Sequence, residues 1–177
     1  MMKIKFGQER DVDRLEALAA KVSNNLEKQG RGNFFGGLDK EEIEYGISSS
    51  PGALIAENEN EDVLGFAIVQ RPTEEEKKIY QGEFLCLEGP VKFSILNGIL
   101  VDPEHRGEGI GKKIINASKN AAKITGAKYL VGTIHPENVA SKNVILATEK
   151  QYEESDSFIC TMKDGRALTR VYFCIEI

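Results

Sequence analysis

A glycine-rich segment that follows an apolar run is the feature that most constrains the fold of this chain. The run at residues 94–101 is apolar and β-prone, and Pro103 prevents its extension. Three glycines follow, at Gly107, Gly109 and Gly111. Beyond them, apolar and small residues recur at helical spacing. The pattern predicts a strand, a loop and a helix, in that order.

This segment has the properties of a site for the diphosphate of a nucleotide-type cofactor. The first amides of a helix lack carbonyl partners and lie at the positive end of the helix dipole. Glycines have no Cβ, so phosphate oxygens can approach successive N–H groups. Arg106 adds a planar charged group beside them. The alternative is an ordinary tight turn, which the flanking strand and helix disfavour.

Two common nucleotide-binding motifs do not fit the segment. A Walker-type loop has four residues between its first glycine and a Gly-Lys-Ser/Thr, but Gly107 is too close to Gly111 and Lys113 replaces the hydroxyl residue. A dinucleotide fingerprint requires a third glycine where this chain has Lys112. An unrelated nucleotide-binding domain is therefore only a minor alternative.

The segment resembles the acetyl-CoA diphosphate loop of the GNAT N-acetyltransferase superfamily. That loop has the pattern Arg/Gln-x-x-Gly-x-Gly/Ala, which Arg106, Gly109 and Gly111 match in full. The resemblance implies that acetyl-CoA is bound by this loop, by backbone groups at the end of the preceding strand, and by the start of a later helix. The corresponding residues are Ile99, Leu100, Val101, Arg106, Gly107, Glu108, Gly109, Ile110, Gly111, Lys112, Asn138 and Ser141. For Asn138, a plain helix N-cap is the alternative role.

The resemblance extends over most of the chain and implies the fold of the family. We expect one α/β domain (α+β in some schemes) over residues 1–177, with a mixed, mostly antiparallel central sheet of about seven strands flanked by helices. Strands 4 and 5 should splay apart to hold the pantetheine arm. The expected strands are residues 3–6, 53–57, 63–69, 94–101, 127–134, 158–162 and 168–177. The expected helices begin near residues 12, 39, 110 and 138.

The implied chemistry is direct transfer of an acetyl group from acetyl-CoA to a primary amine in a ternary complex. A backbone N–H on the fourth strand would polarise the thioester carbonyl, and the amine must lose a proton before it attacks. His135, Glu88 and Tyr152 are the candidate catalytic residues. Their structural alternatives are a hydrogen-bonded turn residue, an exposed loop charge and a packing residue, respectively.

Two catalytic side chains that are frequent in the family are missing from the matching positions. The fourth strand has no carboxylate, and the helix after Asn138 has no tyrosine. A non-catalytic acyl-CoA-binding or sensor protein with the same fold therefore remains the alternative function.

Two connections are expected to line the acceptor site. Residues 30–37 form a glycine-rich loop that contains Phe34 and Phe35, and residues 71–93 form a long second connection. The acidic runs at residues 57–62 and 74–76 would attract a cationic amine, although solvated turns and a helix start explain them equally well.

Net charge, apolar segments and cysteine spacing indicate which partners, cellular location and metal sites to expect. A net charge of −5 argues against nucleic-acid binding, and the absence of a signal-like or membrane-length apolar segment favours a cytoplasmic protein that does not bind membranes. The three cysteines lack metal-ligand spacing, so we expect reduced thiols and no metal site. The apolar stretch at residues 169–177 would pair across a homodimer if its edge were free, or lie buried in the monomer's own sheet.

Overall fold

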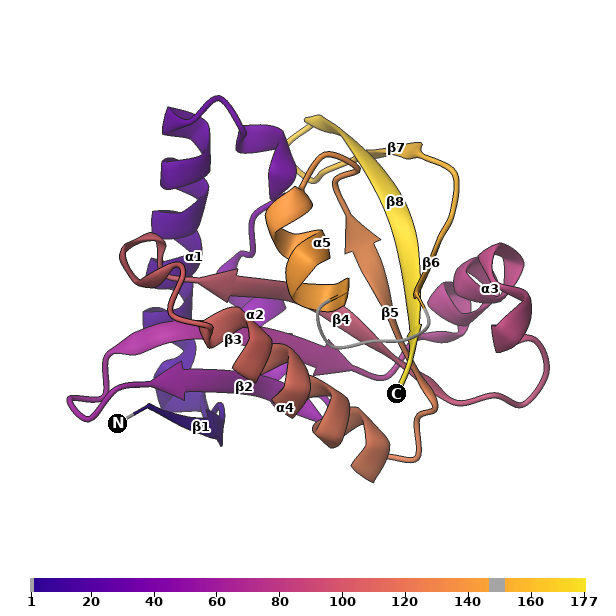
Figure 1. The fold of residues 1–177 in the computed structure, drawn as a ribbon, viewed down its shortest axis with the longest axis horizontal. Helices are drawn as coiled ribbons and strands as arrows, with labels where there is room; N and C mark the ends of the chain where they lie inside the picture. The colour runs from indigo at the N-terminus through magenta and orange to yellow at the C-terminus, as the bar shows by residue number, and fades with distance from the viewer. Residues whose placement is uncertain (1, 147–151) are drawn as a thin grey trace.

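The computed structural model describes residues 2–146 and 152–177 and contains one sheet flanked by helices (Figure 1). The strands follow the order β1-β2-β3-β4-β5-β8-β6, and β7 pairs with β8. The β4–β5 pair is parallel and all the others are antiparallel. The strands are β1 (Lys3–Phe6), β2 (Gly52–Glu57), β3 (Val63–Gln70), β4 (Phe93–Val101), β5 (Tyr129–Ile134), β6 (Tyr152–Glu154), β7 (Phe158–Thr161) and β8 (Ala167–Glu176). This arrangement confirms the expected fold class.

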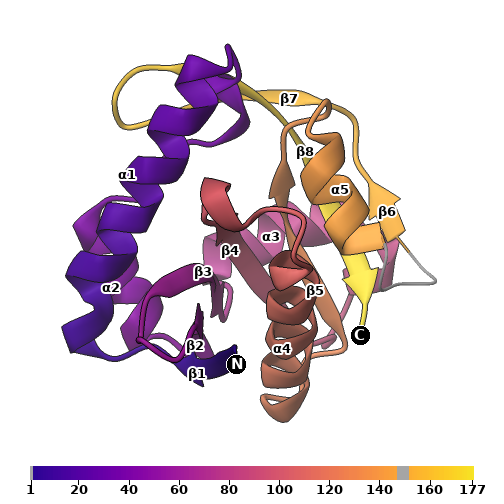
Figure 2. The same cartoon turned by 60° about the vertical axis from the view of Figure 1, so that its left-hand side comes forward.

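Five α-helices in the described residues cover the two faces of the sheet (Figures 1 and 2). They are α1 (Val12–Lys28), α2 (Lys40–Ser48), α3 (Glu74–Glu83), α4 (Ile110–Ile124) and α5 (Val139–Leu146). The first two pack on one face through a core that includes Leu15, Ile43 and Phe66. The opposite face carries α4 and α5, with Ile114 and Ile145 in the core beneath them. None of the described helices is long and apolar enough to cross a membrane.

Capping boxes fix where two of the helices begin. At the start of α2, Asp39 accepts from the Glu42 N–H at 2.8 Å, and the Glu42 side chain accepts from the Asp39 N–H at 2.9 Å. Thr73 and Glu76 make the same reciprocal pair at the start of α3. Each box satisfies two backbone donors that a helix start leaves open. The first box confirms the expected helix near residue 39.

The structure adds two elements that the sequence analysis did not define. Most of the expected connection at residues 71–93 consists of α3 and a following 3₁₀ turn at Leu85–Leu87. Tyr80 and Phe84 are buried against β4, β5 and β8, at a distance from the opening between β4 and β5. An eighth strand, β6, pairs with β8. The central sheet thus has one strand more than expected.

The strands β4 and β5 separate after a short parallel stretch. Their pairing runs from Phe93–Tyr129 to Leu96–Gly132 and then ends. Directly after this point β4 contains a bulge, at which Gly98 has a φ of +99°. A Cβ on Gly132 would lie 2.8 Å from the Leu96 carbonyl oxygen, so glycine permits the close approach at the last pair. The end of β4 therefore keeps a backbone edge that β5 does not cover.

The last strand is an interior strand of the sheet. One edge of β8 pairs with β5, and its other edge pairs with β6 and β7. A free edge was the reason to expect pairing across a homodimer, and this edge is not free. The strand is buried within the monomer's own sheet, and a homodimer stays a prediction that this strand does not support.

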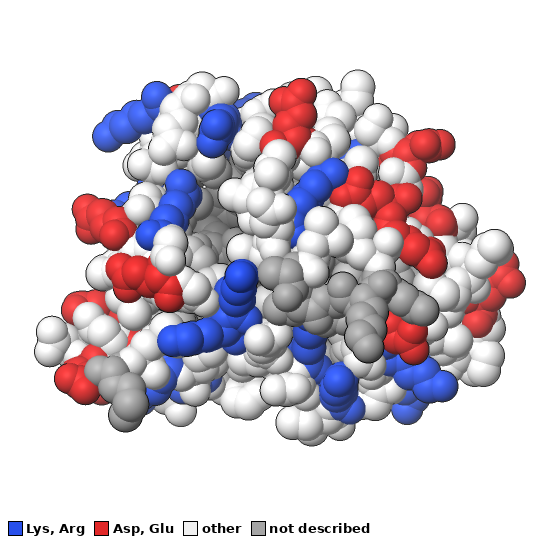
Figure 3. All heavy atoms as spheres, viewed as in Figure 1, with Lys and Arg blue, Asp and Glu red and all other residues white. Residues whose placement is uncertain are grey.

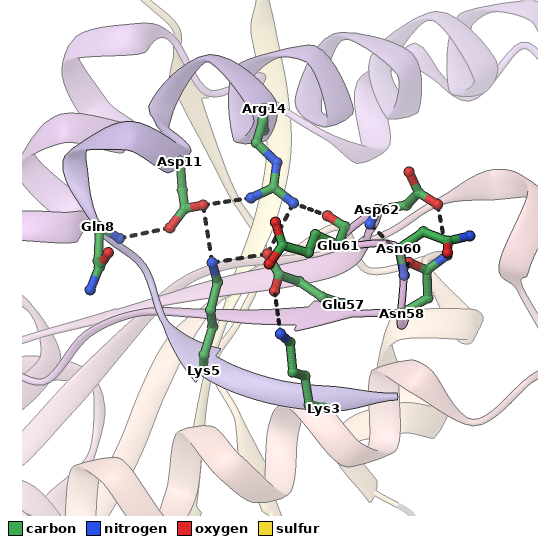
Figure 4. A network of polar contacts seen from close by, with 10 residues as sticks. All are labelled: Lys3, Lys5, Gln8, Asp11, Arg14, Glu57, Asn58, Asn60, Glu61 and Asp62. Carbon is green, nitrogen blue, oxygen red and sulfur yellow. Dashed lines mark hydrogen bonds and ion pairs between the residues drawn. The ribbon is translucent and has the colours of Figure 1, made fainter. Parts of the chain in front are cut away.

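A cluster of paired charges joins β1, α1 and β2 at one corner of the fold (Figure 4). This corner network consists of Lys3, Lys5, Asp11, Arg14 and Glu57. Asp11 and Glu57 are fully buried. Arg14 bonds both carboxylates, at 2.6 Å and 2.9 Å, and Lys5 also bonds both, at 3.2 Å and 3.0 Å.

The cations of the corner network keep its carboxylates ionised. Burial on its own raises the pKa of Glu57, but hydrogen bonds from Lys5 and Arg14 outweigh it and hold that pKa below its ordinary value. Burial also raises the pKa of Asp11, but hydrogen bonds from the Gln8 amide and from Lys5 outweigh it and hold that pKa below its ordinary value. The adjoining residues 58–62 form a turn closed by bonds between Asn58 and Asp62. The first acidic run therefore has a structural role.

Candidate active site

A cavity of about 950 Å³ opens where β4 and β5 separate. Its walls come from the end of β4, the start of α4, α5, the loop at residues 30–38 and the β7–β8 hairpin. Figure 3 shows the hollow on this face of the molecule, with Lys and Arg side chains on several sides of it. A hollow of this size is typical of sites for small molecules and cofactors.

The glycine-rich loop forms one end of the cavity. Gly107 has a φ of +88°, and Gly109, the N-cap of α4, has a φ of +75°. A Cβ at either residue would meet no atom within 4 Å, so the backbone there is open to a ligand. The first helical bond runs from the Lys113 N–H to the Gly109 carbonyl, at 3.2 Å. The preceding helix amides have no carbonyl partner within α4 and form an anion site.

The residues expected to hold acetyl-CoA come together around this cavity. All of them line it except Glu108, which pairs with His105 at 3.1 Å. Arg106 is exposed and reaches Asn25 Oδ1 at 3.3 Å. Asn138 caps α5, because its Oδ1 accepts from the Ser141 N–H at 3.2 Å, and it also lines the cavity. The glycine cradle, the open helix amides and the uncovered β4 edge fit a diphosphate followed by an extended arm.

His135 is a fixed, neutral ring beside the cavity. It is 5% exposed and stacks on Phe34 with ring centroids 4.6 Å apart. Its Nδ1 accepts from the Glu137 N–H at 3.1 Å, so the ring proton lies on Nε2. That nitrogen is 3.0 Å from the side-chain amide of Asn33, whose oxygen accepts the proton in the orientation that satisfies both groups.

The surroundings of His135 do not favour a catalytic base. Burial, followed by the charge of Arg170, lowers the pKa of His135 from its ordinary value. Both ring nitrogens are already hydrogen-bonded. The structure thus supports the alternative role of a hydrogen-bonded turn residue.

Glu88 and Tyr152 lie outside the cavity lining. Glu88 is exposed and follows the 3₁₀ turn after α3. Tyr152 stacks on Phe173 and donates its hydroxyl to Glu154. Burial raises the pKa of Tyr152. Neither position supports the direct catalytic role suggested by the sequence, because the side chains are held on other parts of the surface.

One of the two loops expected at the acceptor site lines the cavity. Phe34 and Phe35 both line the cavity, and the hairpin β7–β8 holds their loop: Arg170 donates to the Asn33 carbonyl at 2.9 Å, and Arg166 to the Gly36 carbonyl at 3.1 Å. No described residue of the 71–93 connection lines the cavity. The apolar side of α3 packs on the far part of the sheet instead. The acidic start of α3 therefore lies outside the cavity lining as well.

Several polar residues of the cavity wall were not expected from the sequence. They are Asn97, Thr133, Glu137, Cys160 and Arg170. Arg170 left a signal, since it is a charged residue within the apolar run 168–175. Asn97 and Thr133 lie directly after the last β4–β5 pair, a position that becomes visible only with the strand register. In the described residues, no group of three or more His, Cys, Asp or Glu side chains could hold a metal ion.

Comparisons with known proteins agree with the geometry. The family model described as the acetyltransferase (GNAT) family matches residues 15–146. No curated protein matches the chain by sequence. Similar solved structures include the ribosomal-protein-S18-alanine N-acetyltransferase from Escherichia coli, with a TM-score of 0.69 and 14% identity over 100% of this chain and 94% of that one.

Two further solved structures contain coenzyme A ligands. The diaminobutyrate acetyltransferase from Paenibacillus lautus, with L-2,4-diaminobutyric acid and coenzyme A, has a TM-score of 0.67 and 19% identity over 99% and 95% of the two chains. A phosphinothricin acetyltransferase from Sinorhizobium meliloti, with acetyl-CoA, has a TM-score of 0.66 and 16% identity over 99% and 88%. These likenesses show the shared fold. Because the family model matches well over half of this chain, the chain belongs to the GNAT acetyltransferase family.

Proposed function

We propose that this protein is an acetyl-CoA-dependent N-acetyltransferase that acetylates a primary amine by direct attack in a ternary complex. The cavity carries this proposal, because it joins an anion-binding loop at the start of α4 to an uncovered backbone edge on β4. The first feature suits a diphosphate and the second an extended amide-containing arm. Their succession in one cavity matches the order of these groups in coenzyme A.

Different parts of the cavity wall would bind different parts of coenzyme A. Backbone amides at the start of α4 would hold the diphosphate, while Arg106 and Lys112 supply positive charge beside it. Asn138 and Ser141 line the same cavity from the start of α5, which packs beside α4. We assign Ile99, Leu100 and Val101 to the arm through their backbone groups.

The acetyl group is supplied by the thioester of acetyl-CoA, and the protein must position and polarise it. A backbone N–H of β4 beyond Leu96 would donate to the thioester oxygen as charge develops there. This role requires no particular side chain. It explains how β4 can serve the reaction without the carboxylate that many relatives have.

Removal of the amine proton is the step with the fewest candidate groups. Glu137, which is exposed in the turn that precedes α5, is the only acidic residue among the described residues of the cavity wall. We propose that the acceptor amine enters unprotonated or loses its proton to water, with Glu137 as the only nearby carboxylate. This scarcity of bases is the observation that keeps a non-catalytic acyl-CoA sensor as the second candidate.

Release of free thiol from acetyl-CoA separates the two functions. The purified protein is incubated with acetyl-CoA and a panel of amines, and both thiol and the mass of the acetylated amine are measured. Amine-dependent release with a matching product establishes the transferase. Saturable binding of acetyl-CoA without release by any amine would establish the sensor instead.

A further inference from the structure

Arg170 is a buried cation in the cavity wall with no carboxylate to balance it. The residue is 7% exposed and projects from β8. No carboxylate in the described parts of the chain forms an ion pair with Arg170, and the side chains that influence its pKa are Cys160 and Arg166. This contrasts with the corner network, where each buried charge has partners.

The hydrogen bonds of Arg170 use only part of its guanidinium. Nη1 donates to the carbonyl oxygens of Asn33 and Thr169, at 2.9 Å and 3.0 Å. A guanidinium has five N–H donors, so the donors on Nε and Nη2 remain. In the described residues, the enclosed side-chain atoms without a partner are on Glu57, Gln70 and Ser94. The remaining donors of Arg170 are therefore not sealed from the cavity that the side chain lines.

An unbalanced buried charge is costly to the folded protein. Burial lowers the pKa of Arg170, but an arginine side chain keeps its charge in proteins. Two neutral carbonyl groups offset the lost hydration only in part. An anion that enters the cavity and meets the free edge of the guanidinium would complete the site, since a planar guanidinium matches a carboxylate with two parallel bonds.

Arg170 lies on a different wall from the diphosphate loop. It projects from β8 and bonds the Asn33 carbonyl in the loop at residues 30–38, whereas the glycines of the diphosphate site precede α4. Figure 2 shows where β8 and α4 lie in the fold. The strands β4 and β5 separate between these walls. Arg170 bonds the carbonyl of Asn33, which directly precedes Phe34 and Phe35, and these two side chains line the cavity together with Cys160 and Arg170. An anion bound there would belong to the acceptor.

We propose that Arg170 binds a carboxylate of the acceptor, so that the acceptor is an amino acid or another amine that carries a carboxylate close to its amino group. The proposal rests on the N-acetyltransferase function proposed above. It favours a small amino-carboxylate over a polyamine or the terminal amine of a long peptide, because neither of these places a carboxylate beside the amine.

Matched pairs of acceptors test the proposal. Each of the common amino acids, together with short diamino acids, is compared with its primary carboxamide by thiol release and product mass. The carboxamide has the less basic amine, so amine basicity alone would favour it. The expected result is at least one amino acid with a kcat/KM about ten to a hundred times that of its carboxamide, the effect of one charge-assisted contact.

Two variants separate an anion contact from a structural tether. Arg170→Gln should remove the preference by lowering kcat/KM for the amino acid only, through KM. Arg166→Gln is the control, because Arg166 also holds the loop through the Gly36 carbonyl but its charge is paired with Asp164 at 2.6 Å. This control should keep the preference for the carboxylate.

Each outcome of this test decides the proposal. Three results would overturn the role of Arg170 and leave the N-acetyltransferase function standing. They are equal use of acids and carboxamides, an equal loss for both acceptors in Arg170→Gln, and turnover only of amines without a carboxylate. Acetyl-CoA binding with no turnover of any amine overturns both the acceptor assignment and the N-acetyltransferase function. Calorimetry with acetyl-CoA on each variant shows that the cofactor site is intact.

Discussion

The corner network and the cavity both bury charged side chains, but they balance those charges differently. In the corner network, Asp11 and Glu57 lie within 3.2 Å of the cations Lys5 and Arg14. In the cavity, Arg170 has carbonyl partners only. Charges that the chain balances itself contribute to the fold, whereas a charge without a counter-ion inside a cavity indicates the chemistry of what binds there.

The largest effect is expected at the anion-binding end of the cavity. Gly109→Asp should raise the dissociation constant of acetyl-CoA by more than about a hundredfold, because the new residue places a negative charge beside the diphosphate. Isothermal calorimetry measures this change. Gly109→Asn is the matched control, since asparagine tolerates the left-handed region without adding charge, and its loss should be clearly smaller. Equal losses in both variants would show that charge has no part in the effect.

Breaking the corner network should affect stability and leave binding unchanged. Glu57→Gln removes one side of a buried ion pair and should lower the free energy of unfolding by about 2 to 3 kcal/mol, less than a fully buried pair because Lys5 and Arg14 reach solvent. Denaturant unfolding measures the change. Acetyl-CoA affinity serves as the control and should stay at the parent value. A large loss of affinity would mean that the two regions are coupled.

Replacing Arg170, the unbalanced charge of the cavity, should change the stability of the protein only slightly. Arg170→Met removes a buried cation together with two hydrogen bonds to carbonyl groups, and these contributions oppose each other. We expect the free energy of unfolding without ligand to change by less than about 1 kcal/mol. A loss as large as that of Glu57→Gln, under the same denaturant conditions, would show that Arg170 is part of the framework of the fold.

The smallest expected effect is the acid dependence of stability. The folded pKa values of Glu57 and Asp11 lie below their ordinary values of 4.5 and 3.8. The unfolded chain therefore binds more protons in this window, so the contribution of the network is complete above about pH 4.5 and is lost as the pH falls through the folded pKa values. Unfolding at pH 7 and at low pH should show a smaller loss in Glu57→Gln than in the parent. Arg170→Gln should keep the parent's dependence, and an identical dependence in Glu57→Gln would contradict this assignment.

The sequence predicted the parts of the fold that depend on local patterns. The amphipathic stripe beginning at Val12, the capping box at Asp39 and the glycine turn at Gly109 each encode their structure within a few residues. The sequence analysis did not define α3, because the acidic residues 74–76 suit a solvated turn and a helix start equally well. The short strand β6 depends on pairing with β8, a contact that no local pattern reveals.

The candidate site also has one part that local sequence patterns reveal and one part that depends on contacts between distant segments. The loop from Arg106 to Gly111 is contiguous, so its motif is readable before any fold is known. The proposed acceptor end is assembled from β4, β5, β8 and the loop at residues 30–38, which are far apart in the chain. Arg170 was missed because its importance lies in the absence of a counter-ion, and only the folded structure shows which charges lie near it.

A crystal structure of the protein with acetyl-CoA would show whether the cavity between β4 and β5 receives the acetyl donor. We expect the diphosphate to contact the backbone amides of residues 109–112 and the thioester to lie against the uncovered edge of β4. A diphosphate bound away from the start of α4, or an arm that does not enter the opening between the two strands, would contradict this expectation.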